Sequence, residues 1–205
     1  VAIATGPMGL GLGVAQGFAI AGRTSPRYDV YTLTGDGELQ EGPIWEAVMY
    51  AGQAHLDNFC VLVDRNHGQL DVHTRTVFPL PDLAPVFRSF GWEVSAVDAT
   101  GYDGVFAALE TFRYGPRNGR PTAIICESTK GYGGFSEFLN RHKVTVPAAL
   151  IAQELRLQGL DRQARVEDLA RHLESLEGTS EGERARDLLL DAARGMHLEV
   201  RRSAG

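Results

Sequence analysis

The stretch VYTLTGDGE, residues 30–38, joins a short apolar run to a polar turn that contains Asp36. The same arrangement returns in FCVLVDRNHG, residues 59–68, where Asn66 follows the apolar run. Short apolar runs without polar alternation are typical of strands that are buried on both faces of a parallel sheet. If the two strands are neighbours, both turns lie at the same edge of the sheet, which is where such sheets bind ligands.

Two further runs have the same character, and helical patterns lie between the runs. The expected strands are residues 30–34, 59–63, 92–97 and 122–126, and the expected helices are residues 11–22, 43–54, 83–90 and 102–113. Alternation of strands and helices at this spacing predicts an α/β fold, a parallel sheet flanked by helices on both faces. We expect this domain to extend over residues 1–146.

Residues 147–205 contain no strand pattern, which predicts a C-terminal helical appendage. Val166, Leu169, Leu173 and Leu176 recur at helical spacing, and a break is expected at Gly178-Thr179. Ser180 and Glu183 then have the spacing of a capping box that opens a last helix. We interpret this tail as a solvated appendage, with a docking surface for a partner as the alternative.

The composition is that of a globular protein. The 205 residues are 43% hydrophobic and 22% charged, enough for one ordinary domain and a small appendage. The net charge of -6 argues against nucleic-acid binding. The apolar opening at residues 1–22 has no basic lead and is interrupted by glycines, so we expect neither a signal peptide nor a membrane span. Cys60 and Cys126 lie in apolar runs, which predicts buried, reduced thiols in a cytoplasmic protein.

The two turns carry oxygen ligands suited to a hard cation. The carboxylate of Asp36 and the amide oxygen of Asn66 fit Mg²⁺ or Ca²⁺, ions that usually keep water or phosphate oxygens as further ligands. The glycines beside them allow the backbone to approach a diphosphate and to offer it N–H groups. A GDG sequence alone indicates only a tight turn, but its combination with an Asn after the next strand predicts a metal–diphosphate site.

The run GDGELQEGPIWEAVMYAGQAHLDNFCVLVDRNHGQLD, residues 35–71, resembles the thiamine diphosphate motif of the transketolase family. The resemblance implies that Mg²⁺ is bound by the side chains of Asp36 and Asn66 and by the backbone carbonyl of Gly68. It also implies a dimer interface at or near Glu41 and Glu46, with Glu41 communicating with the other active site. The cofactor-binding residues that it implies in this run are Gly35, Gly37, Glu38, Glu41 and Leu70.

A second segment, TGPMGLG at residues 5–11, is similar to the TGPLGQG segment of the same family. There this segment lines the aminopyrimidine and thiazolium rings, which implies cofactor contacts for Gly6, Pro7 and Met8. Leu10 stands where the family usually has Gln, so a polar contact from that position is not expected. Close packing of a helix on the sheet is the alternative explanation of these glycines.

A third segment, STKGYG at residues 128–133, resembles the part of the family that closes this domain. In relatives a downstream histidine approaches the diphosphate and the reacting centre, and His142 is the candidate here. It is the one catalytic residue that we expect in this chain, although its surroundings depart from the family's His-Gly pattern. Lys130 is expected either to approach the cofactor or to be a solvated surface lysine.

The resemblance implies a transferase that moves a two-carbon ketol unit between sugars, sugar phosphates or sugar-like acceptors. In the family, the glutamate that activates the aminopyrimidine belongs to a second, pyrimidine-binding domain on the far side of a dimer interface. We therefore expect the partner to be a separate pyrimidine-binding transketolase subunit, in a heterotetramer. The chain begins at Val1, so a fragment of a longer enzyme is the other explanation.

Four other functions fit parts of the pattern. An α-type subunit of a 2-oxoacid dehydrogenase and a deoxyxylulose-phosphate-synthase-like enzyme share the thiamine motif, but TGPMGLG favours transketolase. A non-catalytic regulatory paralogue would be expected to have lost its metal ligands, and Asp36 and Asn66 are both present. A nucleotide-binding α/β protein is disfavoured because no GxxxxGK[ST] sequence occurs.

Overall fold

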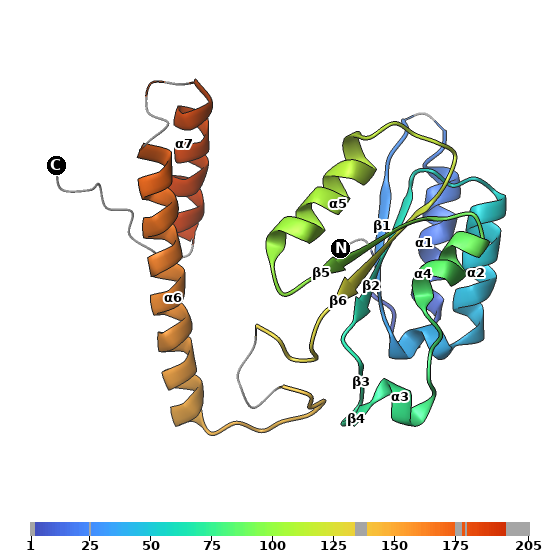
Figure 1. Cartoon of the computed structure of the whole chain (residues 1–205), viewed down its shortest axis with the longest axis horizontal. Coiled ribbons are helices and arrows are strands. Elements are labelled where there is room, and N and C mark those ends of the chain that lie inside the picture. The colour runs from blue at the N-terminus through green and yellow to red at the C-terminus, as the bar shows by residue number, and fades with distance from the viewer. Residues whose placement is uncertain (1–2, 25, 134–138, 175–177, 179, 196–205) are drawn as a thin grey trace. The chain divides into compact units, whose positions relative to one another are not determined.

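The structure is a computed structural model that describes residues 3–24, 26–133, 139–174, 178 and 180–195 (Figure 1). The chain divides into two compact units, Val1–Val144 and Thr145–Gly205. The first unit contains the sheet, and the second consists of helices.

The first unit is built on a four-stranded parallel sheet with the order β1-β2-β6-β5. Its strands are β1 (Val30–Gly35), β2 (Phe59–Arg65), β5 (Glu93–Asp98) and β6 (Thr122–Glu127), so all four predicted strands are confirmed. Strand β5 begins one residue later than predicted, because the backbone N–H of Trp92 donates to the carbonyl of Phe87 at 3.2 Å, within the turn that follows α4.

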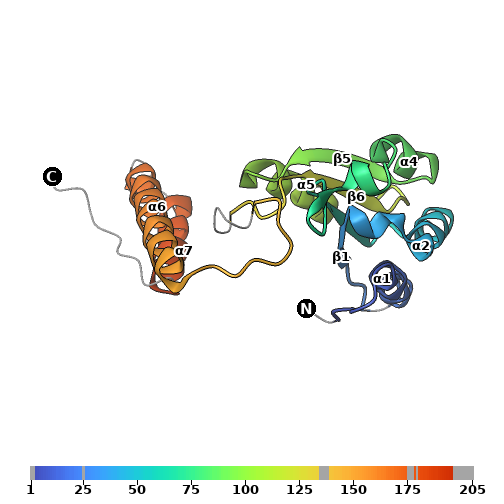
Figure 2. The same cartoon turned by 90° about the horizontal axis from the view of Figure 1, so that it is seen from below.

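Helices cover both faces of the sheet, as predicted. Figure 1 shows α5 (Tyr102–Tyr114) on one side of the sheet and α1 (Leu10–Ala21), α2 (Gly42–Gln53) and α4 (Leu83–Ser89) on the other. The larger core lies under these three helices and includes Phe59, Phe87 and Trp92, whose rings contact one another edge to face or tilted. Helices α1 and α2 lie side by side (Figure 2), joined by a hydrogen bond from Gln16 Nε2 to the carbonyl of Ala47.

The smaller core lies beneath α5 and contains both cysteines. Cys60, Phe112, Ile124 and Cys126 are buried there together, and both thiols are free. Burial raises the pKa of Cys60 to about 12 and also raises the pKa of Cys126, so both remain uncharged thiols at neutral pH.

Four short elements were not predicted from the sequence. After β1 comes the 3₁₀-helix η1 (Gly37–Gln40), and after β2 come the paired strands β3 (Gly68–Gln69) and β4 (Val72–His73) and the helix α3 (Thr74–Val77). Segments this short carry no periodic pattern of apolar residues. Their conformation depends on hydrogen bonds to other parts of the chain, such as the one from the Thr74 N–H to the carbonyl of His67.

The second unit is a helical pair, α6 (Ala148–Glu174) and α7 (Ser180–Gly195). Val166, Ala170 and Leu173 of α6 pack against Leu189 and Ala193 of α7. The predicted apolar face was wrong at Leu169, whose side chain is 46% exposed. The neighbouring residue Ala170 is the one that lies in the contact between α6 and α7. Leu176, Thr179 and the side chain of Ser180 lie outside the described residues. Among the described helices, none is both long enough and apolar enough to cross a membrane.

Gly52 provides a test of the packing between α2 and the turn before β5. A Cβ atom at Gly52 would overlap the carbonyl oxygen of Phe90, so we expect Gly52→Ala to lower the free energy of unfolding by about 1–3 kcal/mol. Gly13→Ala in α1 is the control, because a Cβ there meets no atom within 4 Å and alanine favours a helix by up to about 1 kcal/mol over glycine. Urea denaturation measures both, and equal stabilities of the two variants would contradict this packing.

Candidate functional site

The two polar turns lie together at the carboxyl edge of the sheet. Strands β1 and β2 pair in parallel, with Gly35 opposite Asp64. One residue further along, the N–H of Asp36 donates to the carbonyl of Asp64 at 3.1 Å. The register of these two strands therefore brings the turn that contains Asp36 to the turn that contains Asn66.

Asp36 is a buried carboxylate whose hydrogen-bond donors are all neutral. It is 2% exposed and accepts from the N–H of Gly37 and the N–H of His67, both at 2.8 Å, and from Thr74 Oγ1 at 3.3 Å. Burial raises the pKa of Asp36, and these hydrogen bonds partly oppose the effect. A buried charge without a countercharge is costly, so this carboxylate is a favourable place for a cation.

Asn66 is held at both ends of its amide group. Its Nδ2 donates to Asp64 Oδ2 at 2.8 Å, and its Oδ1 accepts from the N–H of Gly68 at 2.9 Å. An amide oxygen has two lone pairs, so Oδ1 retains one for a metal ion.

Gly68 lies where a side chain would not fit. A Cβ atom there would meet Lys130 Cδ at 2.5 Å and Asn66 Oδ1 at 3.3 Å. The ammonium group of Lys130 donates to the carbonyl of Leu70 at 2.5 Å, and Leu70 itself is 62% exposed with a φ of 52°. Lys130 is therefore a partly buried residue that ties down this turn, and not the solvated surface lysine of the alternative prediction.

His67 and Arg65 connect the Asn66 turn to the neighbouring strand end. Glu127, the last residue of β6, accepts from Arg65 Nη1 at 2.9 Å and lies 3.1 Å from His67 Nε2. His67 has a positive φ of 59°, which is uncommon for a residue with a side chain. The Arg65–Glu127 ion pair and the contact of His67 with Glu127 hold the turn in that conformation.

The segment around His142 reaches the same region through its backbone. The N–H of His142 donates to Asp71 Oδ1 at 2.7 Å, and the N–H of Asn140 donates to the carbonyl of Lys130 at 2.9 Å. His142 is exposed. The structure thus brings the residue next to the Asn66 turn, and its catalytic role stays a prediction.

Glu38 connects the two predicted motifs. Its Oε1 accepts from the N–H of Gly9 at 2.8 Å, and its Oε2 accepts from Thr34 Oγ1 at 2.8 Å and from the N–H of Gly35 at 3.4 Å. Gly9 has a φ of 82°, and a Cβ there would overlap the side chain of Glu41. The start of α1 is therefore attached to the turn after β1 by one carboxylate.

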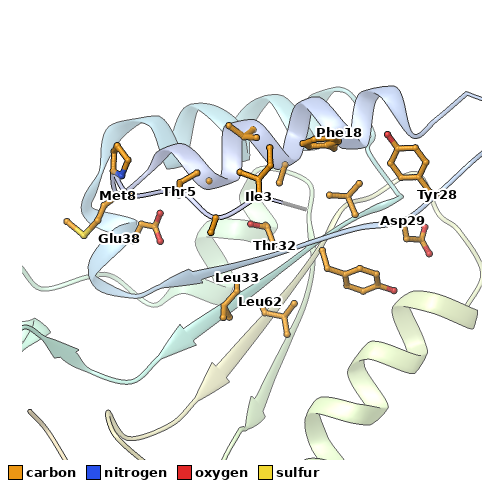
Figure 3. Close-up of a pocket in the computed structure, with 18 residues that line it drawn as sticks. Ile3, Thr5, Met8, Phe18, Tyr28, Asp29, Thr32, Leu33, Glu38 and Leu62 are labelled. Carbon is orange, nitrogen blue, oxygen red and sulfur yellow. The ribbon is translucent and has the colours of Figure 1, made fainter. Parts of the chain in front are cut away.

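Gly6, Pro7 and Met8 line a pocket of about 720 Å³ together with Glu38 (Figure 3). The pocket lies between the segment that leads into α1, helix α1 itself and strand β1. Its lining does not include Asp36, Asn66 or Gly68, so the structure does not bring the residues predicted at the rings into one cavity with the residues predicted at the metal.

The remaining residues predicted to bind the cofactor or to lie at a dimer interface are found at the end of β1, in the turn that follows it and along α2. Gly35 ends β1, and the N–H of Gly37 donates within the turn to Asp36 Oδ1. Glu41 occupies the N-cap position of α2 without a side-chain capping bond, and Glu46 is exposed on that helix.

Sequence reasoning missed the residues that support the two predicted ligands. Thr74 donates to Asp36, and Asp64 accepts from Asn66 and from Ser128 Oγ at 2.8 Å. The position of Asp64 at the carboxyl end of a predicted strand could have indicated that it lies close to the two predicted ligands. Nothing in the sequence around Thr74 signals a contact with a residue 38 positions away.

The available oxygen atoms fit a hard divalent cation. Asp36 contributes a carboxylate, Asn66 an amide oxygen and Gly68 a backbone carbonyl, which are ligand types of Mg²⁺ and Ca²⁺. Among the described residues, no three His, Cys, Asp or Glu side chains cluster, so a site of that composition is absent from this part of the chain. The geometry defines an α/β protein whose polar, glycine-containing turns lie together at the carboxyl ends of its parallel strands, the edge at which such sheets bind ligands.

The chain belongs to the family described as "Transketolase, thiamine diphosphate binding domain", whose model matches residues 1–164. Two solved transketolases have the same fold. The transketolase from Campylobacter jejuni is 31% identical in sequence, with a TM-score of 0.60. The match covers 67% of this chain and 22% of the chain of that enzyme. The transketolase from Leishmania mexicana is 29% identical in sequence, with a TM-score of 0.58. The match covers 66% of this chain and 22% of the chain of that enzyme.

Two curated relatives are named as subunits of transketolases. The 6-deoxy-6-sulfo-D-fructose transketolase subunit of Clostridium sp. (strain MSTE9) is 38% identical over 135 residues, 65% of this chain and 48% of the relative. An apulose-4-phosphate transketolase subunit of Actinobacillus succinogenes is 39% identical over 134 residues, 65% and 48% respectively. The chain therefore spans about half the length of these relatives.

Glu38→Ala tests the attachment of α1 to the first turn. The variant leaves two backbone N–H groups and a hydroxyl without their acceptor, so we expect the free energy of unfolding to fall by about 1–3 kcal/mol. Glu46→Ala, an exposed change on α2, is the control and should stay within about 0.5 kcal/mol of the original chain. Urea denaturation measures the difference, and indistinguishable variants would show that Glu38 has no such role.

Proposed function

We propose that this chain is the metal- and diphosphate-binding part of a thiamine diphosphate-dependent transketolase. The observation that carries the proposal is the parallel pairing of β1 with β2, which sets the buried carboxylate of Asp36 beside the turn of Asn66. Membership of the thiamine diphosphate binding domain family supports the same cofactor.

In this proposal, Mg²⁺, or Ca²⁺ in its place, binds to Asp36, Asn66 and the carbonyl of Gly68 and is completed by diphosphate oxygens. The neutral hydrogen-bond donors of Asp36 support it, since they leave the negative charge of a buried carboxylate to be balanced by the cation. Gly6, Pro7 and Met8 border the pocket proposed for the rings, and Lys130 holds the backbone of Leu70 beside the metal turn.

Thiamine diphosphate, when bound, supplies the nucleophilic carbon that cleaves the bond beside a ketose carbonyl and carries the two-carbon unit. The proposed contribution of this chain is to bind and orient the cofactor. Asp36 and Asn66 anchor the metal on rigid strand ends, and Glu38 sets the distance between the ring segment and the diphosphate turn. His142 is proposed to exchange protons with the substrate, supported by its place beside the Asn66 turn.

We propose further that a pyrimidine-binding subunit supplies the glutamate that activates the cofactor, in a heterotetramer. The two relatives named as transketolase subunits support this arrangement. Their names carry different sugars, which supports sugars or sugar phosphates as the substrate class. The two free, buried cysteines support a reducing, cytoplasmic location.

Asp36→Ala tests the proposed metal site. We expect the original chain to bind thiamine diphosphate only when Mg²⁺ is present. In the variant we expect the affinity to fall more than about 100-fold, because loss of a residue that only orients a metal ligand already lowers metal affinity about 10- to 100-fold. Isothermal titration calorimetry, with and without a pyrimidine-binding subunit, measures the affinity.

The control is Asp98→Asn, which changes an exposed aspartate at the end of β5 in the same sheet and should bind as the original chain does. Magnesium-independent binding, or equal affinities of Asp36→Ala and the original chain, would refute the site.

A turnover assay tests the proposed division of labour. The purified 205-residue chain should transfer no ketol unit from a ketose phosphate to an aldose phosphate, and addition of a pyrimidine-binding subunit should produce transfer. Product formation followed by mass spectrometry decides this. Sustained turnover by the chain alone would contradict the need for a second subunit.

A further inference from the structure

Asp64 is the residue at which three strand ends meet. Its backbone carbonyl accepts from the N–H of Asp36 at 3.1 Å, after β1. Its Oδ2 accepts from Asn66 Nδ2 at 2.8 Å, and its Oδ1 accepts from Ser128 Oγ at 2.8 Å, after β6. Ser128 is fixed in turn, because its N–H donates to the carbonyl of Arg65 at 3.1 Å. Asp64 therefore contacts the two residues proposed to bind the metal through their side chains, Asp36 and Asn66, and the neighbouring strand end.

The amide of Asn66 has two unlike ends, and only its oxygen can bind a cation. A carboxylate accepts hydrogen bonds and a backbone N–H donates them, so Asp64 selects the NH₂ end and Gly68 selects the oxygen end. If the amide rotated by half a turn, the NH₂ group would face the metal and also meet the N–H of Gly68.

We propose that Asp64 is a positioning residue that keeps the Asn66 oxygen directed at the metal, and that Ser128 keeps Asp64 in place. This inference rests on the proposed function, since it assigns a role to Asp64 at the same metal site. The competing explanation is that Asp64 binds the metal directly. Its Oδ2 accepts from the NH₂ of Asn66 and its Oδ1 accepts from Ser128, as the positioning role requires, and the double variant Asp64→Asn with Asn66→Asp distinguishes the two roles.

Asp64→Ala is the first variant of the test. An alanine at position 64 offers no side-chain acceptor, so Asn66 and Ser128 both lose their hydrogen bond to it, whereas an asparagine could accept from Asn66 and donate to Ser128 Oγ. We expect the magnesium-dependent affinity for thiamine diphosphate to fall about 10- to 100-fold, as for other groups that orient metal ligands. Asp98→Ala, the same change at an exposed aspartate that ends β5, is the matched control, with no change expected.

The double variant Asp64→Asn with Asn66→Asp separates positioning from direct binding. It exchanges donor and acceptor, so the amide at 64 donates to the carboxylate at 66 while its oxygen accepts from Ser128. The carboxylate at 66 still offers oxygen to the metal. We expect this double variant to bind at least about tenfold more tightly than Asp64→Ala with Asn66→Asp, which has the same carboxylate at 66 but no donor at 64. Equal affinities of the two double variants would overturn the proposal.

A measurement without ligand examines the hydrogen bond itself. The side-chain NH₂ of Asn66, followed by ¹⁵N NMR, should exchange with water more slowly than an exposed amide, and should lose this protection in Asp64→Ala. Fast exchange in the original chain would overturn the inference. Thermal unfolding of each variant shows whether it is folded before its affinity is compared.

The two hypotheses fail differently. If the original chain, with a pyrimidine-binding subunit present, shows no magnesium-dependent binding of thiamine diphosphate, the proposed function fails and this inference fails with it. If the original chain binds and Asp64→Ala binds equally well, only the role of Asp64 is wrong.

Discussion

The parallel pairing of β1 with β2 is the interaction on which the site depends. Its register sets Gly35 opposite Asp64, and this alignment brings the turn after one strand to the turn after the other. A shift by one residue would reverse which side chains face the core and would separate Asp36 from the N–H of His67. The cores on both sides of the sheet hold that register, so the stability of the domain and the geometry of the site are coupled.

Asp36 illustrates the stability cost of the proposed metal site. The carboxylate is buried, its pKa is raised by desolvation, and its hydrogen-bond donors are neutral. An apolar residue there would avoid the desolvation cost, but it could not bind a cation. Such local conflicts with stability are expected where the surrounding structure serves to bind a ligand.

Most of the fold could be predicted because its strands are short apolar runs with polar turns after them, and because glycine-punctuated helices separate them. The pattern failed where contacts in space decide the outcome. The β3–β4 pair and α3 are too short to show a periodic pattern of apolar residues. Leu169 was predicted to lie on the buried face of its helix, but Ala170 packs between α6 and α7 instead. The pocket along α1 could not be predicted either, because it depends on the spacing between a helix and a strand.

The sequence by itself determined the class of fold and the chemical types of the proposed ligands, because strand patterns and the sequences GDG and DRN are local. Only the tertiary structure decided how those ligands are held. Glu38 meets Gly9 across 29 positions because α1 packs against β1, and Asp64 meets Ser128 across 64 because β2 pairs with β6. Hydrogen bonds of this kind require both partners to be placed within about 3 Å, and that precision comes from packing.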